Sequence, residues 1–160
     1  LDIHYTNFTM KEVNSMGRFL DLRSSMNAGV SGAPGVPITA TPALFGVIGL
    51  QTENVSNKVI TLTGMVGVSS LLLGTTFAIQ ICRGTTVYNP ANVIYTLVQN
   101  VRLSAFSDTY AFTAQDLLAP AAAETIYSAF IFGGSLLGLL FTGERVGPEV
   151  FWGIASQGAP

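Results

Sequence analysis

Apolar and polar residues alternate along most of the chain. In the segment VITLTGMVGV, Ile60 and Leu62 share one parity, whereas Thr61 and Thr63 occupy the other. A period of two places successive side chains on opposite faces of an extended strand. The alternation recurs along the chain and predicts strands over residues 44–51, 58–68, 75–82, 86–88, 93–103, 109–115, 125–132 and 149–156.

Turn-forming segments separate these runs. TENVSN, RGTT and NPAN are rich in Gly, Pro, Asn, Ser and Thr, which favour turns. Several short strands with regular turns, and no convincing amphipathic helix, indicate an all-β protein built as an antiparallel β-sandwich. The apolar parity of three strands predicts the core residues Ile60, Leu62, Val66, Phe77, Ile79, Ile81, Tyr110 and Phe112.

The first 43 residues differ from the rest of the chain. Residues 1–23 are richer in charge and are interpreted as an N-terminal arm or a first strand. Residues 24–43 are rich in Gly, Pro, Ser and Ala, which predicts a linker or long loop. The strand-like runs follow, so residues 44–160 are predicted to form the folded β-domain.

The composition favours self-association. Charged residues make up 10% of the chain, whereas about 25% is usual for soluble domains. Hydrophobic residues reach 49%, and the net charge of −2 supplies no basic field for nucleic acid. With so little polar material to cover a monomer, we expect copies of the chain to bury apolar surface against one another.

A membrane protein is the alternative to this interpretation. Residues 59–82 and 125–143 are uncharged and are long enough to cross a bilayer, which takes about 20 residues. The first stretch contains many Ser, Thr and Gly residues and alternates with period two at both ends, which favours two strands and a loop. The second is split by Gly133-Gly134 and is the better helix candidate. The alternating runs favour strands over a membrane span.

The residues that usually carry catalysis are scarce. His4 is the only histidine and lies in the arm, and Cys82 is the only cysteine and is expected to be a buried apolar side chain. Asp108 and Asp116 could form a carboxylate pair, but Asp116 follows YAFTAQ and is expected at a solvated strand end. The sequence therefore predicts no catalytic residue, no metal site and no cofactor.

The last strand-like run is unusually apolar for a chain end. Phe151, Trp152 and Ile154 lie within four residues of one another, after the turn signal Gly147-Pro148. Chain ends fray unless something holds them, so we expect this segment to be a strand inside a sheet. Phe151 and Trp152 then point to opposite faces. Phe151, Trp152 and Ile154 are the candidates in this segment for an interface with a second subunit, and one of the two aromatic residues is expected to fill the core while the other meets that subunit.

The order of these runs resembles a known family. VITLTGMVGVSS, FAIQICRGTTVYN, DTYAFTAQDLLAPAAAETIYSAFI and RVGPEVFWGIAS are similar to the tumour-necrosis-factor-like jelly-roll domains of bacterial spore-surface proteins, including the heads of collagen-like exosporium glycoproteins. The resemblance spans about residues 45–156. It implies a jelly roll of eight to ten strands, packed as a homotrimer, with the last strand in the inner sheet against the trimer core. This chain departs from the family because only two collagen-like triplets, GAPGVP, precede the domain.

These observations lead to one main functional hypothesis. The chain is expected to be a non-catalytic, extracellular structural protein that self-assembles on a spore or cell surface, with copies of itself and other surface-layer proteins as partners. Alternatively, it is a filament subunit whose arm, through Ile3, Tyr5 and Phe8, adds a strand to the next subunit. A carbohydrate- or receptor-binding head is a further alternative, which the small apolar loops SSLLLG and GGSLLGLL disfavour.

Overall fold

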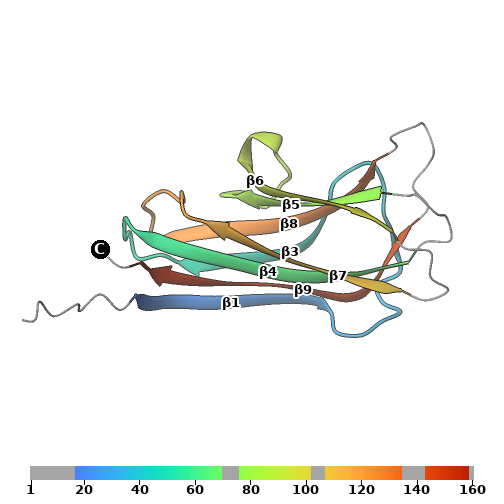
Figure 1. The fold of residues 1–160 in the computed structure, drawn as a ribbon, viewed down its shortest axis with the longest axis horizontal. Coiled ribbons are helices and arrows are strands. Elements are labelled where there is room, and N and C mark those ends of the chain that lie inside the picture. Colours follow the sequence, from blue (N-terminus) through green and yellow to red (C-terminus); the bar gives the residue numbers. More distant parts are fainter. Residues whose placement is uncertain (1–16, 70–75, 102–106, 135–142, 159–160) are drawn as a thin grey trace, which may run out of the picture.

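In the part of the chain that the structure describes, β-strands make up nearly all of the regular secondary structure (Figure 1). The computed structural model describes residues 17–69, 76–101, 107–134 and 143–158. Within them a single 3₁₀ turn, Pro90–Asn92, interrupts the strands. The strands are β1 (Arg18–Ala28), β2 (Val36–Pro37), β3 (Ala43–Gln51), β4 (Lys58–Ser69), β5 (Thr76–Arg83), β6 (Val93–Asn100), β7 (Asp108–Asp116), β8 (Glu124–Gly134) and β9 (Glu144–Gln157).

The strands form two sheets. Sheet A has the order β1-β9-β4-β7, with the short β2 paired to β9, and sheet B has the order β3-β8-β5-β6. All the pairs are antiparallel. The long strands pair from the outside of the sequence inward: β1 with β9, β3 with β8, β4 with β7, and β5 with β6.

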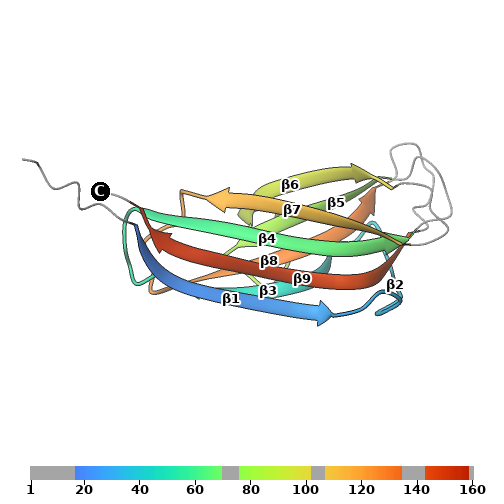
Figure 2. The same ribbon diagram turned by 60° about the horizontal axis from the view of Figure 1, so that its bottom comes forward.

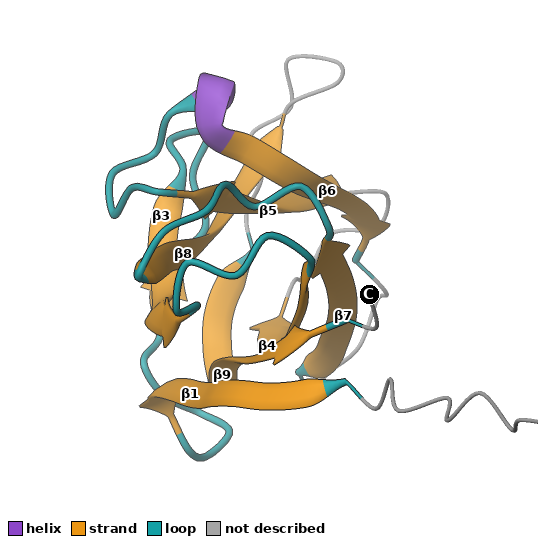
Figure 3. Cartoon of the chain, turned by 90° about the vertical axis from the view of Figure 1, so that its left-hand side faces the viewer, coloured by secondary structure: helices purple, strands orange, loops and turns teal. Residues whose placement is uncertain are grey.

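The two sheets lie face to face and enclose one core (Figures 1 and 2). Along one side of the sandwich β1 contacts β3, and along the other β6 contacts β7. The view along the strands in Figure 3 shows the two layers end-on. The prediction of an all-β antiparallel sandwich is therefore confirmed.

The alternation of buried and exposed side chains along the strands produces the core. In β4 and β9, buried positions alternate over most of the strand with positions that keep some exposure. Three phenyl rings from both sheets meet near the centre: Phe112 lies 6.2 Å from Phe45 and 6.3 Å from Phe151, measured between ring centroids. Such aromatic contacts add to the free energy gained by removing the rings from water.

A glycine in β3 allows the sheets to approach closely at this point. A Cβ atom at Gly46 would lie 2.5 Å from Cβ of Phe151, which is closer than non-bonded carbon atoms approach. The missing side chain at Gly46 is what makes room for Phe151 between the sheets.

The observed strands differ from the predicted ones in several places, and a short strand, β2, lies within the predicted linker. Residues 86–88 are not a strand but part of the connection from Gly84 to Asn92; there Thr85 Oγ1 accepts a hydrogen bond from the backbone N–H of Val87, which curls the chain. β1 runs on to Ala28, inside the predicted linker, because its pairing with β9 continues to that point. β9 begins at Glu144 rather than 149, and β6 ends at Asn100.

We predict that Gly46→Ala lowers the free energy of unfolding by about 1–3 kcal/mol, because the new methyl group must displace Phe151 in a close-packed core. Gly29→Ala is the matched control, since its Cβ would lie 3.5 Å from Sδ of Met26, an ordinary contact. Urea unfolding monitored by tryptophan fluorescence measures both variants. Equal stability of the two variants would show that β3 and β9 do not pack in this way.

Candidate interaction surface

β9 presents the two aromatic residues of the tail to opposite sides of sheet A. Phe151 is fully buried between the sheets, whereas Trp152 and Ile154 are half-buried on the outer side. Phe151 is therefore a core residue and is not available to a partner, which corrects its place among the predicted interface residues. Trp152 and Ile154 remain on an outward-facing surface.

The outer side of sheet A carries a row of large apolar side chains on three strands. Residues paired across neighbouring strands share a face. Trp152 lies between Ser24 of β1 and Thr63 of β4 in the strand register. We call the surrounding surface the sheet A face and define it by Leu22, Met26, Met65, Val150, Trp152 and Ile154.

Much of this face is open to solvent. Leu22 is 50% exposed and Met26 is 69% exposed, although both are large hydrophobic residues. Leu22 lies opposite Ile154, and Met26 lies opposite Val150. Trp152 lies between these two pairs along β9, so the large apolar side chains are neighbours rather than isolated, although small polar residues lie among them. Clustered apolar side chains mark interaction sites more often than scattered ones do.

Charged residues lie around the sheet A face rather than within it. In β9, the described residues between Glu149 and Gln157 are uncharged, and β4 is uncharged after Lys58. On β1, Asp21 alternates with Leu22 and accepts a hydrogen bond from the backbone N–H of Gln51 in β3, at the side of the sandwich. A partner could therefore cover this face without desolvating a charge, which would be costly.

The other sequence-predicted residues fall into two groups. Ile3, Tyr5 and Phe8 lie outside the described residues. Cys82 is buried. The residues predicted for the core are all buried: Ile60, Leu62, Val66, Phe77, Ile79, Ile81, Tyr110 and Phe112.

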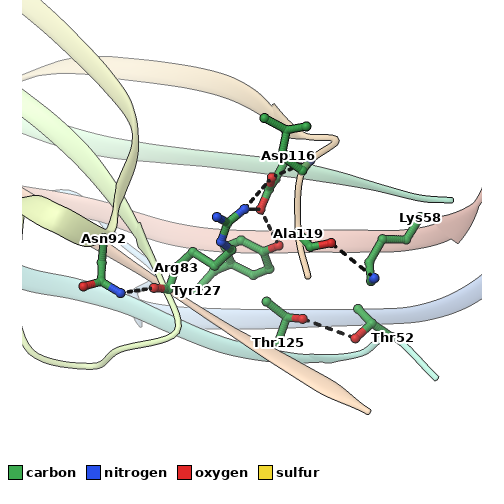
Figure 4. A network of polar contacts seen from close by, with 9 residues as sticks. Thr52, Lys58, Arg83, Asn92, Asp116, Ala119, Thr125 and Tyr127 are labelled. Carbon is green, nitrogen blue, oxygen red and sulfur yellow. Dashed lines mark hydrogen bonds and ion pairs between the residues drawn. The ribbon is translucent and has the colours of Figure 1, made fainter. Parts of the chain in front are cut away.

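A polar network joins the two sheets at the end of the sandwich where β7 ends (Figure 4). Nη1 of Arg83 in β5 donates to both carboxylate oxygens of Asp116 in β7, at 3.0 and 2.9 Å. The hydroxyl group of Tyr127 in β8 donates to Oδ2 of the same carboxylate at 2.9 Å. Asp116 is only 4% exposed, so its expected position at a solvated strand end is wrong.

The hydrogen bonds explain why Asp116 can be buried. A carboxylate removed from water is tolerated when a cation and hydrogen-bond donors surround it. No signal in the local sequence distinguishes Asp116 from an ordinary strand-end carboxylate, because both partners come from strands of the opposite sheet. Asp108, the other member of the suggested carboxylate pair, lies at the opposite end of β7, so the two do not form a pair.

Lys58 is a second buried charge near the same end. It is 3% exposed, and its Nζ donates to the backbone carbonyl oxygens of Val55, at 2.6 Å, and Ala119, at 3.3 Å. These contacts tie the start of β4 to the connection that follows β7 (Figure 4). The sequence placed Lys58 at the start of a strand but gave no sign that its amine is buried.

A buried ion pair holds the opposite end of the sandwich. Nε of Arg145 lies 2.6 Å from Oε1 of Glu149, and Nη2 lies 2.8 Å from Oε2, within β9. The side-chain amide of Asn27 in β1 also donates to Glu149. Removing one partner of such a pair leaves a buried charge uncompensated, which is strongly destabilising.

The described residues contain no group of three or more His, Cys, Asp or Glu side chains that could hold a metal ion. The same residues include no helix that is long and apolar enough to span a bilayer. In comparisons with known proteins, no family model matches the chain and no curated protein matches it significantly.

Tyr127 gives the network a pH dependence. Burial raises the pKa of its hydroxyl group far above the usual 10.0, and the neighbouring charge of Asp116 acts in the same direction, whereas Arg83 acts against them. The hydroxyl group therefore stays protonated in the folded protein after it has begun to ionise in the unfolded chain. The stability that it contributes is complete below pH 10 and decreases as the pH rises above that value.

We predict that Tyr127→Phe lowers the free energy of unfolding at neutral pH by about 1.5–3 kcal/mol, because a charged acceptor loses its donor. The difference between the parent and this variant should shrink as the pH is raised through about 10. Tyr95→Phe, in which a half-buried tyrosine stacked on Phe112 loses its hydroxyl group, is the control. The free energy of unfolding of the parent and both variants is measured by denaturant unfolding across this pH range. The prediction is wrong if Tyr127→Phe and Tyr95→Phe change this free energy by the same amount at every pH.

Proposed function

We propose that this protein is a non-catalytic structural protein that self-assembles through the sheet A face. The observation that carries the proposal is an uncharged surface with Trp152 at its centre and exposed Leu22 and Met26 beside it. A lone domain gains nothing from placing such residues in water. Burial against a second copy would remove them from water and gain about 25 cal/mol for each Å² of apolar surface covered.

The proposed fold is a jelly roll. Its support is the nested pairing of eight long strands, first with last and so on inward, distributed over two sheets. Jelly rolls are sandwiches of eight strands built from two Greek keys. The resemblance of residues 45–156 to tumour-necrosis-factor-like domains of spore-surface proteins points to the same arrangement.

The proposed assembly is a homotrimer on the surface of a spore or cell, outside the cytoplasm. In the resembled family the last strand lies in the sheet that faces the trimer core. Here that strand is β9, the neighbour of both β1 and β4, and it carries Trp152 outward. An obligate interface of this kind typically buries more than about 2,000 Å², and the sheet A face spans several strands that could contribute to such an area.

We predict that Leu22→Glu dissociates the oligomer, because each copy would bring a carboxylate into an apolar interface. Val98→Glu is the matched control, since Val98 is 61% exposed on β6 in the other sheet. Light scattering coupled to size-exclusion chromatography gives the mass of each variant. The proposal fails if the parent is a monomer at micromolar concentration, or if both substitutions have the same effect.

A filament joined by the N-terminal arm is a second candidate. One observation favours it: β1 starts at Arg18 opposite Gln157 of β9, so the preceding residues attach at the end of the sandwich where the chain also finishes. Ile3, Tyr5 and Phe8 give that segment apolar side chains. An arm attached at one end can pair with a free strand edge of the next subunit, and repetition of this head-to-tail contact gives an open fibre.

We predict that deletion of residues 1–15 leaves the domain folded but abolishes higher-order assembly, because the deletion ends before β1. Electron microscopy compares fibres of the parent with those of the truncated protein, and circular dichroism verifies that the strands remain. Fibres that persist without residues 1–15 would exclude the arm as the connector and leave the closed oligomer.

A further inference from the structure

A cavity of about 400 Å³ lies at the end of the sandwich that carries the Arg83 network. The connection after β5 lines one side of it, and the connection before β8, together with the start of β8, lines the other. The volume falls within the range of about 300–1,000 Å³ that is usual for small-ligand sites. Of its lining residues, the following matter for recognition: Arg83, Asn92, Pro120, Ala122, Glu124 and Ile126.

Arg83 brings fixed hydrogen-bond donors to this cavity. Its Nη1 is engaged by Asp116, while its side chain stays partly exposed. Its Nε and Nη2 make no hydrogen bond within the described part of the chain, so their N–H groups can reach a ligand. Asp116 holds the guanidinium group in one orientation before any ligand arrives, which reduces the entropy lost on binding.

Asn92 supplies an acceptor at the cavity, and Glu124 adds negative charge at its rim. Asn92 donates its side-chain N–H to the backbone carbonyl oxygen of Arg83, which leaves its Oδ1 as an acceptor. The carboxylate of Glu124 receives a hydrogen bond from Gln51 through Oε2, and its Oε1 lies over Gly49 of β3. Glu124 therefore adds negative charge at the rim of the cavity rather than an acceptor inside it. The cavity thus combines donors and acceptors, the combination that a hydroxyl group, itself both donor and acceptor, can satisfy.

The charges and the apolar lining narrow the ligand class. Asp116 compensates the charge of Arg83, and Glu124 adds a negative charge at the rim, so the site offers no excess of positive charge to a phosphate or carboxylate. Pro120, Ala122 and Ile126 provide apolar surface for the C–H groups of a ring. We propose that this cavity binds a neutral, hydroxyl-rich ring of the size of a monosaccharide.

This site is independent of the proposed assembly. Its residues come from sheet B and from loops at the end of β7, whereas the sheet A face lies on β1, β4 and β9. It also lies at the opposite end from Ser69 and Glu144, which flank the connections containing SSLLLG and GGSLLGLL.

The test uses the full chain and a panel of simple methyl glycosides, with acetate and inorganic phosphate as charged probes. Saturation-transfer NMR detects binding, and titration calorimetry gives the affinity. Ala122→Phe fills the cavity, and Ala121→Phe places the same ring on an exposed neighbour that does not line it. Thermal melting and light scattering establish that both variants fold and assemble like the parent.

We expect at least one glycoside to bind, Ala122→Phe to weaken that binding by about tenfold or more, and Ala121→Phe to leave it unchanged. Binding of acetate or phosphate alone would overturn the ligand class. Binding of a glycoside that is unaffected by Ala122→Phe would overturn the location, and failure of the whole panel to bind would overturn the site. None of these results would alter the oligomeric state on which the self-assembly proposal depends.

Discussion

The pairing of β9 between β1 and β4 is the interaction on which the rest of the structure depends. β9 contributes Phe151 to the core and Trp152 to the outer surface of sheet A. It also carries the buried Arg145–Glu149 pair. A strand with neighbours on both sides is held along its length by hydrogen bonds, which explains how the chain can keep its only tryptophan close to its end.

The two ends of the sandwich are held by polar contacts, whereas its middle is apolar. At one end Arg83, Asp116 and Tyr127 connect three strands, and at the other Arg145 and Glu149 lie under the edge strand β1. Buried ion pairs add little net stability compared with apolar residues, but they are costly to break. The network at the first end also has a positional role. Arg83 and Tyr127 belong to sheet B and Asp116 to sheet A, so misplacing either sheet would leave the buried carboxylate without its partners.

The few charged residues are unevenly distributed in the folded protein. Within the described residues, several charged side chains are buried in polar contacts at the two ends of the sandwich. The outward-facing positions of β4 and β9 over the middle of sheet A are uncharged. A surface assembled in this way is poorly suited to permanent contact with water. The proposed self-assembly on that face and the proposed recognition of a small ligand at the end of the sandwich are compatible, because they involve different strands and loops.

The sequence by itself determined the class of fold and most of the strands. Period-two alternation in β4, β5 and β7 identified the buried side chains, because parity depends only on local backbone geometry. It also required that Phe151 and Trp152 point in opposite directions. It did not determine which of the two enters the core, since both parities of this segment contain large apolar residues.

The tertiary structure decided that choice and the roles of the buried charges. Phe151 faces inward because Gly46, more than 100 residues earlier in the chain, leaves space for its ring. Asp116 and Lys58 are buried because donors from two other strands converge on Asp116, and backbone carbonyl oxygens from two loops converge on Lys58. Contacts between separate strands and loops leave no periodic signal in any one segment, so only the folded chain reveals them.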